Sequence, residues 1–260
     1  MLKRASALIK MAFLAVLLSG CVASTSGGGA GQDETVQVAE AAYSVGDYVE
    51  SARLFELAAT RHPNSVTALI GLGKSYAALG QFSRANNALM RASALGGRHP
   101  EVHNQLGNLA LLELHPKQAI EHFDRALTLD RKNLAGLTGK AVSLDYLSRH
   151  AEAQDVYRSA LQSYPTNFAL LSNFALSQVL SGSIGQGTKL MEELLRDPSH
   201  GSTARANLAI AYALDGRERD ARALLSGLMS DAEVAEALRH YARVRKEYLA
   251  GKPVGYLIFQ

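Results

Sequence analysis

The sequence predicts an all-α protein, a right-handed solenoid of about six helical hairpins followed by a C-terminal capping helix. Three observations support this prediction. The chain repeats with a period of 34 residues from Gln32 to residue 235, without an inserted residue. Small residues recur at positions 8 and 20 of each frame, and bulky apolar residues recur at position 24. Position 15 is a glycine in four frames, and it is Leu114 and Ser148 in the other two.

The spacing has a direct physical explanation. Two helices of about 13 residues, each about 20 Å long, and their short turns account for one frame. Small residues at positions 8 and 20 let the two helices approach closely, and the large residue at position 24 fills the space toward the next hairpin. One hairpin cannot bury this face alone, so stacked hairpins cover one another. The sequence therefore places six repeats at residues 35–235.

This period resembles the tetratricopeptide repeat, a family of helix-turn-helix units. The resemblance implies a scaffold that binds protein or peptide clients in a groove, through positions 2, 5, 9 and 12 of the first helices. Asn104 and Asn108 lie one helical turn apart, and they would either pair with the backbone of an extended client or bond within the solenoid. The groove residues are Ile70, Lys74, Asn104, Asn108, Leu111, Thr138, Val142, Asp145, Ser172, Leu176, Val179, Thr203 and Ile210.

The first 20 residues have the layout of a secretory signal peptide. Lys3, Arg4 and Lys10 precede a short apolar run at residues 11–18. A membrane-spanning helix needs about 20 apolar residues, so this run is too short to span a bilayer. Cleavage after Gly20 would remove the segment from the mature protein.

Cys21 is the predicted site of lipidation. The run ends in Leu18-Ser19-Gly20-Cys21, which resembles the bacterial lipobox. The resemblance implies a diacylglyceryl group on the Cys21 thiol and a further acyl chain, such as palmitate, on its amine. Two or more acyl chains hold a protein stably at a membrane. Residues 21–34 would then be the lipidated cysteine and a flexible Ser/Thr/Gly-rich tether.

The residue after the cysteine indicates the membrane. Val22 stands where an aspartate would favour retention in the inner membrane of enteric-type bacteria. The sequence therefore favours the outer membrane, with the repeats anchored by lipid and facing the periplasm.

The charge balance excludes a general affinity for nucleic acid. The chain has 27 basic and 24 acidic residues, a net charge of +3. Removal of Lys3, Arg4 and Lys10 with the signal peptide leaves equal numbers of both signs. A neutral mature protein has no basic surface for phosphate backbones.

No group of residues indicates an enzyme, a cofactor site or a metal site. Gly73-Lys74-Ser75 resembles the end of a phosphate-binding loop, but Ala68 stands where that motif needs a glycine. His99 and His103 are four residues apart, and solvent-exposed histidines explain them better than zinc ligands do. The sequence therefore predicts a protein without catalytic, cofactor-binding or metal-ligating residues.

The fifth frame is predicted to be the softest. Gly182, Gly185 and Gly187 crowd the start of its second helix, and a helical glycine costs about 1 kcal/mol relative to alanine. The alternative is ordinary drift within a tolerant repeat.

Residues 236–260 are predicted to form the capping helix and an apolar tail. Ser230 and Glu233 have the spacing of a capping box at the start of that helix, and Gly251 and Pro253 end it. The tail, residues 254–259, would either fold back along the end of the solenoid or form an exposed docking segment.

Lipobox and repeats together resemble the TadD family of Flp/Tad (tight adherence) pilus-assembly lipoproteins. The resemblance implies a non-catalytic outer-membrane adaptor whose clients are the secretin or other pilus-machine components. Two alternatives stay open at this point. One is a pilotin of the type IV pilus system, and the other is a scaffold for peptidoglycan hydrolases and synthases. The sequence leaves the oligomeric state open.

Overall fold

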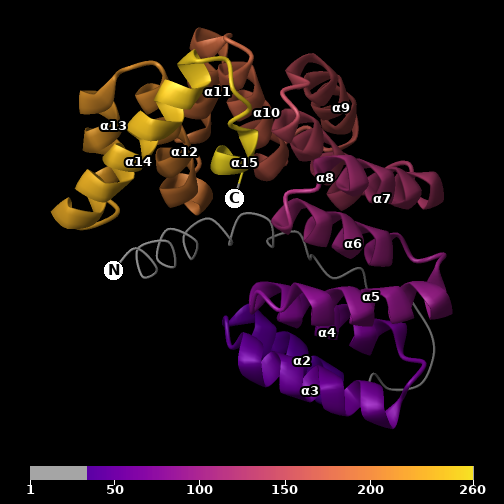
Figure 1. Ribbon diagram of the computed structural model, residues 1–260. Coiled ribbons are helices and arrows are strands. Elements are labelled where there is room, and N and C mark those ends of the chain that lie inside the picture. The colour runs from indigo at the N-terminus through magenta and orange to yellow at the C-terminus, as the bar shows by residue number, and fades with distance from the viewer. Residues whose placement is uncertain (1–33, 260) are drawn as a thin grey trace. The chain divides into compact units, whose positions relative to one another are not determined.

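The computed structural model describes residues 34–259, and every regular element in that range is a helix (Figure 1). The helices form consecutive hairpins that follow the predicted frames, so the all-α hairpin fold is confirmed. The hairpins are α2 (Glu34–Ser44) with α3 (Tyr48–Arg61), α4 (Val66–Ala78) with α5 (Phe82–Gly96), α6 (Pro100–Leu112) with α7 (Pro116–Leu129), α8 (Leu134–Tyr146) with α9 (His150–Ser163), α10 (Phe168–Leu180) with α11 (Ile184–Leu194), and α12 (Gly201–Leu214) with α13 (Glu218–Leu225).

Two further helices follow the hairpins. They are α14 (Asp231–Leu249) and the four-residue α15 (Gly255–Ile258), and a short 3-10 turn, Pro198–His200, precedes α12. The predicted signal peptide, Cys21 and the tether up to residue 33 lie outside the described residues. Within residues 34–259, no helix has the length and hydropathy that crossing a membrane would require.

The chain divides into two compact units at Lys140 and Ala141, within α8. We call residues 34–140 the N-terminal unit and residues 141–259 the C-terminal unit. Within each unit, we call the side formed by the first helices of its hairpins the inner face of that unit.

Close helix packing in the N-terminal unit uses glycines opposite aromatic rings. A Cβ atom on Gly71 would lie 2.2 Å from the ring of Phe55, the position-24 residue of the preceding frame. The ring of Phe123 lies against both Gly107 of its own hairpin and Gly139 of the next one, where a Cβ would approach to 2.7 and 2.2 Å. These contacts confirm that small residues permit the close approach and that position 24 fills the space toward the next hairpin.

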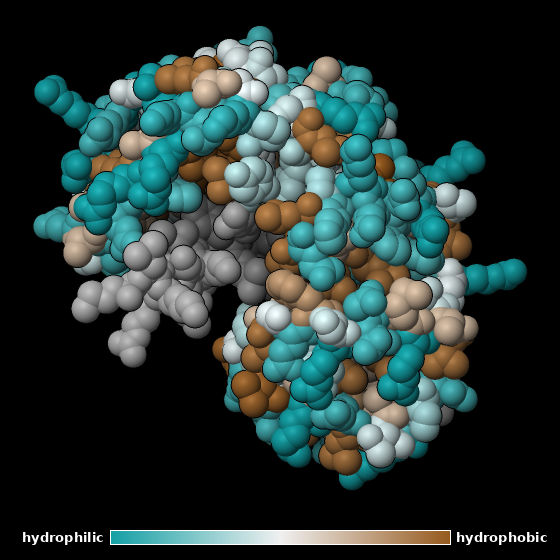
Figure 2. Space-filling view, in the orientation of Figure 1, coloured by the Kyte–Doolittle hydropathy of each residue, from teal (hydrophilic) through white to brown (hydrophobic). Residues whose placement is uncertain are grey.

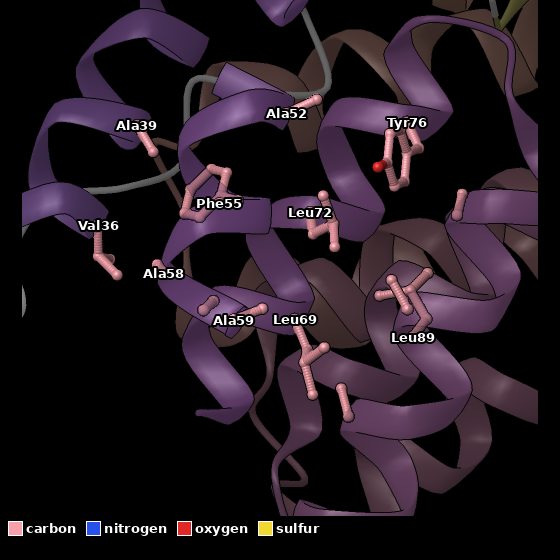
Figure 3. Packing of buried hydrophobic residues seen from close by; sticks show 14 of the residues in the cluster. Val36, Ala39, Ala52, Phe55, Ala58, Ala59, Leu69, Leu72, Tyr76 and Leu89 are labelled. Carbon is pink, nitrogen blue, oxygen red and sulfur yellow. The ribbon is translucent and has the colours of Figure 1, made fainter. Parts of the chain in front are cut away.

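The same pattern builds the apolar core of this unit. Phe55, Leu69, Leu72 and Leu89 are buried, and Figure 3 shows them pointing into the space among α3, α4 and α5. Burial of such a side chain contributes about 1.5–3 kcal/mol to stability. The core therefore depends on contacts between neighbouring hairpins, as expected for a repeat protein.

Position 15 adopts a left-handed backbone conformation in all six frames. The four glycines there have φ between 71° and 90°, and Leu114 and Ser148 have φ of 59° and 57°. Glycine is favoured in this region because it has no Cβ, whereas other residues are strained there. The turn geometry is thus kept even where the glycine is lost.

Lys140, which replaces an apolar residue at position 7, extends to the surface. Its Nζ lies 2.7 Å from Oδ1 of Asp124, and its side chain is 30% exposed. The aliphatic part of a lysine can cover apolar surface while the charge stays near water.

The capping helix α14 packs on α12 and α13. The predicted capping box is present: the Ser230 N–H and Oγ lie 2.9 and 2.7 Å from Oε2 of Glu233. The outward side of α14 exposes Arg239, Arg243 and Lys246, and Figure 2 shows hydrophilic surface there. A terminal element with a polar outer side ends the stack of repeats.

The apolar tail folds back against the C-terminal unit, as one of its two predicted placements required, but it lies against α8 and α12 and not only along the end of the solenoid. Val254, Ile258 and Phe259 are only 3%, 4% and 8% exposed. The segment is therefore not an exposed docking arm in this structure.

Candidate protein-binding surface

The predicted groove residues divide between the inner faces of the two units. Ile70 and Lys74 lie on α4, Asn104, Asn108 and Leu111 on α6, and Thr138 on the first part of α8. The C-terminal unit contributes Val142, Asp145, Ser172, Leu176, Val179, Thr203 and Ile210. Their exposure differs sharply, and that difference decides which of them can contact a client.

In the N-terminal unit, Lys74 lies beside an aromatic pair. Its Nζ is 5.0 Å from the centroid of the Tyr43 ring, and the Tyr43 and Tyr48 rings are 5.1 Å apart. An ammonium group over an aromatic face is attracted by about 0.5–1 kcal/mol at exposed sites. Burial, and to a lesser degree the neighbouring Tyr48, raises the pKa of Tyr43 to about 12. Tyr43 therefore keeps its proton and can act as a hydrogen-bond donor at neutral pH.

Sequence reasoning missed Tyr43, although the signal was present. Tyr43 is position 12 of the first frame, whereas the predicted groove residues begin with the second frame. Position 9 of the next two frames is Lys74 and Asn108, on α4 and α6, which pack against each other. The three side chains are partly exposed on this inner face.

The two asparagines on α6 have different roles. Asn104 is fully buried, and its Nδ2 donates to Oδ1 of Asn133 at 2.8 Å. The same oxygen accepts the Gly136 N–H at 2.8 Å, so Asn104 supports the start of α8. Asn108 is partly exposed and has no hydrogen-bond partner among residues 34–259. Of the predicted pair, only Asn108 is available to the backbone of a client.

The other two predicted groove residues on α6 and α8 of this unit, Leu111 and Thr138, differ in exposure. Leu111 is buried at 8% exposure and serves the core. Thr138 is partly exposed, and its Oγ1 donates to the Leu134 carbonyl at 2.9 Å. The accessible predicted residues of this unit are therefore Ile70, Lys74, Asn108 and Thr138.

The predicted groove residues of the C-terminal unit are buried, except for Thr203, which is partly exposed. Asp145 accepts a hydrogen bond from Ser177 Oγ at 2.8 Å and pairs with His150 Nδ1 at 2.7 Å. Burial raises the pKa of the Asp145 carboxyl, and the bonds to His150 and Ser177 partly oppose that shift. Ser172 Oγ accepts from Asn207 Nδ2 at 2.6 Å. Val142 and Leu176 are core residues.

These contacts correct the interpretation of Asp145 and Ser172. Their polar atoms bond within the chain, and a buried side chain cannot contact a client while it stays buried. The tail and α14 help to cover this inner face. The Tyr146 hydroxyl donates to the Phe259 carbonyl of the tail at 3.0 Å, and the Tyr248 hydroxyl of α14 donates to the Val179 carbonyl at 3.2 Å.

The two fragments that resembled a phosphate-binding loop and a zinc site have structural roles. Gly73-Lys74-Ser75 lies inside α4, where the Ser75 hydroxyl donates to the Gly71 carbonyl at 2.9 Å. The prediction that His103 is solvent-exposed was wrong, because it is 8% exposed and its Nε2 lies 3.2 Å from the Gly97 carbonyl. His99, at the start of α6, is exposed as predicted.

Comparison with protein families and known sequences supports the repeat. Residues 42–109 match the tetratricopeptide repeat family. The uncharacterized protein y4yS of Sinorhizobium fredii (strain NBRC 101917 / NGR234) is 36% identical over 84 residues, which are 32% of this chain. The chain matches 46% of the length of that relative.

Solved structures share the fold. PilW, described as a widely conserved type IV pilus biogenesis factor, superposes with a TM-score of 0.64 at 17% identity, covering 78% of this chain and 96% of PilW. TTC0263, a thermophilic tetratricopeptide-repeat protein of Thermus thermophilus, gives 0.62 at 16% identity, covering 68% and 96% of the two chains. At these identities the similarity concerns the fold alone.

Proposed function

Given that the chain has the tetratricopeptide-repeat fold, which binds protein or peptide partners, we propose that it is a non-catalytic, lipid-anchored adaptor of a bacterial pilus-assembly machine. The binding surface in this proposal is the inner face of the N-terminal unit. The membrane anchor is the acylated Cys21, which holds the repeats at the periplasmic face of the outer membrane.

The observation that carries the proposal is the set of accessible side chains on that inner face. Lys74 presents a charge, Tyr43 an aromatic ring with a hydroxyl, and Ile70 an apolar side chain. Asn108 offers both a donor and an acceptor, which suits the alternating N–H and C=O groups of an extended backbone. Repeat folds commonly serve as scaffolds, and their function depends on the particular site they present.

The pilus pathway is the finer part of the proposal. The lipobox and six repeats resemble Flp/Tad pilus-assembly lipoproteins of the TadD family, so a secretin or another pilus-machine component is the proposed client. The alternative is a role in a type IV pilus system, which the shared fold of PilW brings into consideration.

The anchor is tested with Cys21→Ala. We expect the variant to keep its signal peptide and to leave the outer-membrane fraction on density separation, since no cysteine remains to be acylated. A variant that still sediments with outer membranes and carries acyl chains would contradict the proposed anchor.

The client surface is tested by charge reversal. Lys74→Glu should reduce recovery of pilus-machine proteins from cross-linked detergent extracts, identified by mass spectrometry. Lys117→Glu is the matched control, because Lys117 is an exposed lysine on α7, a second helix outside the inner face. Equal recovery from both variants would reject the inner face as the client surface.

A further inference from the structure

The inner face of the C-terminal unit already holds a short peptide, and that peptide is the chain's own tail. Residues 254–259 follow Gly251, Lys252 and Pro253, which are exposed. Gly251 has a φ of 72°, so the chain reverses direction there. After the turn, α15 runs back along the unit instead of extending the stack (Figure 1).

The tail lies against first helices, as a client of such a repeat would. At one end, a Cβ on Gly255 would lie 2.5 Å from the Asp145 carbonyl oxygen of α8, so only a glycine fits. Leu257 and Ile258 share a small pocket with Ile210 and Leu214 of α12. Ile210 is one of the residues that the repeat register selects for client contact.

The chemistry of this pocket defines the ligand it accepts. Its remaining lining residues are Tyr241 and Val244 of α14, so no charged side chain contributes to it. One polar contact to the tail comes from the Tyr146 hydroxyl, which donates to a main-chain carbonyl, that of Phe259. A main-chain contact does not depend on the ligand's side chain, and the apolar walls favour aliphatic or aromatic side chains.

We propose that this inner face is a binding site for a short apolar peptide segment of a client protein. Residues 254–259 are an internal ligand that such a segment displaces. The tail is suited to displacement because it is short, it is attached at one end through three exposed residues, and its own helix has only four residues. This site is separate from the Lys74 surface of the N-terminal unit.

Competition by the tail has a measurable consequence. A client segment binds only the fraction of molecules whose tail is released, so its apparent dissociation constant rises by the inverse of that fraction. Weakening the tail should therefore tighten binding of the same segment, without any change in the residues of α12 and α14 that contact it.

The test uses a fluorescent synthetic peptide with the sequence of residues 253–259, measured by fluorescence anisotropy against the detergent-solubilised full chain. Ile258→Asp should bind the peptide at least tenfold more tightly than the wild type, because a buried carboxylate expels the tail. Leu249→Asp is the matched control, since Leu249 is an exposed apolar residue of α14 outside the pocket. A double variant, Ile258→Asp with Leu214→Asp, should lose the gain.

Three results would overturn the proposal. One is a folded Ile258→Asp protein, checked by circular dichroism, that binds the peptide no better than the wild type. Another is a gain that persists with Leu214→Asp. The third comes from light scattering: a wild-type dimer that dissociates in Ile258→Asp would make the occupant a second copy of this chain.

A measurement on the wild type does not depend on any variant. Saturating peptide should speed amide hydrogen exchange at residues 254–259, since displacement exposes them to water. Unchanged exchange under saturating peptide would identify the tail as a fixed cap.

Discussion

The inner faces of the two units have the same frame positions but differ in what covers them. In the N-terminal unit, Lys74 and Asn108 at position 9 are partly exposed. In the C-terminal unit, Val142 and Leu176 at the same position are buried, and the apolar tail lies against neighbouring first helices. The repeat register determines where a side chain lies on its helix. Whether a client protein can contact that side chain also depends on residues outside the 34-residue frames, such as the tail.

The largest expected effect tests whether the two units are independent. Phe123→Ala should destabilise the N-terminal unit by about 3–5 kcal/mol, because a fully buried ring against two glycines is replaced by a cavity. Urea unfolding followed by residue-resolved hydrogen exchange should show early opening of residues 34–140 alone. Equal loss of protection in the tail would show that the two units unfold together.

The next effect distinguishes two glycines of α11. Gly187→Ala should destabilise the C-terminal unit by roughly 1–3 kcal/mol, since its Cβ would lie 2.4 Å from the Ala175 carbonyl oxygen. Gly185→Ala should stabilise the unit by about 0.5 kcal/mol, because no atom lies within 4 Å of its Cβ and alanine favours the helix. Thermal unfolding measures both, and changes of the same sign would contradict the packing described for this hairpin.

A smaller effect concerns the cover of the C-terminal inner face. Tyr146→Phe should cost about 1 kcal/mol, because it removes the hydrogen bond to the Phe259 carbonyl and keeps the ring. Tyr48→Phe in the N-terminal unit is a control without a tail contact. Hydrogen exchange at residues 254–259 should accelerate in the first variant and stay unchanged in the second.

The smallest expected change in stability comes from restoring glycine at position 15, and it should be similar in both units. Leu114→Gly and Ser148→Gly place a glycine at positive φ, where other residues carry a strain of roughly 1–2 kcal/mol. Glycine also loses more backbone entropy on folding, about 0.5–1 kcal/mol. We expect a net stabilisation of up to about 1 kcal/mol from each, measured by urea unfolding. A loss of stability in either variant would show that its turn is not strained.

Periodicity predicted the hairpins because the residues that set the period are the ones that pack. Phe55 and Phe123 at position 24 meet glycines, as the pattern implied. The prediction of a soft fifth frame treated its three glycines alike, although Gly187 is at position 20, where the register places a small residue for close packing. The contacts confirm the register: a Cβ on Gly187 would meet the Ala175 carbonyl, whereas Gly185 faces open space.

The binding surface was less predictable, because accessibility depends on contacts that no period records. Asn104 and Asn108 are one turn apart on α6, but only Asn104 meets Asn133, which is 29 residues away in the chain. The apolar composition of residues 254–259 left two placements open, folded back or exposed, and the structure shows the first. The composition could not predict which helices they would lie against.

The pairing of aromatic rings with glycines limits how this chain could gain or lose repeats. Phe55 is followed by Gly71 and Phe123 by Gly139, both at position 6 of the next frame, whereas Leu89 is followed by Gln105. Excision of residues 66–99 would bring Gln105 to the ring of Phe55, where even a single methyl group does not fit. Excision of two frames, residues 66–133, would instead bring Gly139 there. In this part of the chain the exchangeable module is therefore a pair of hairpins, and recombination by single frames would leave a clash at the joint.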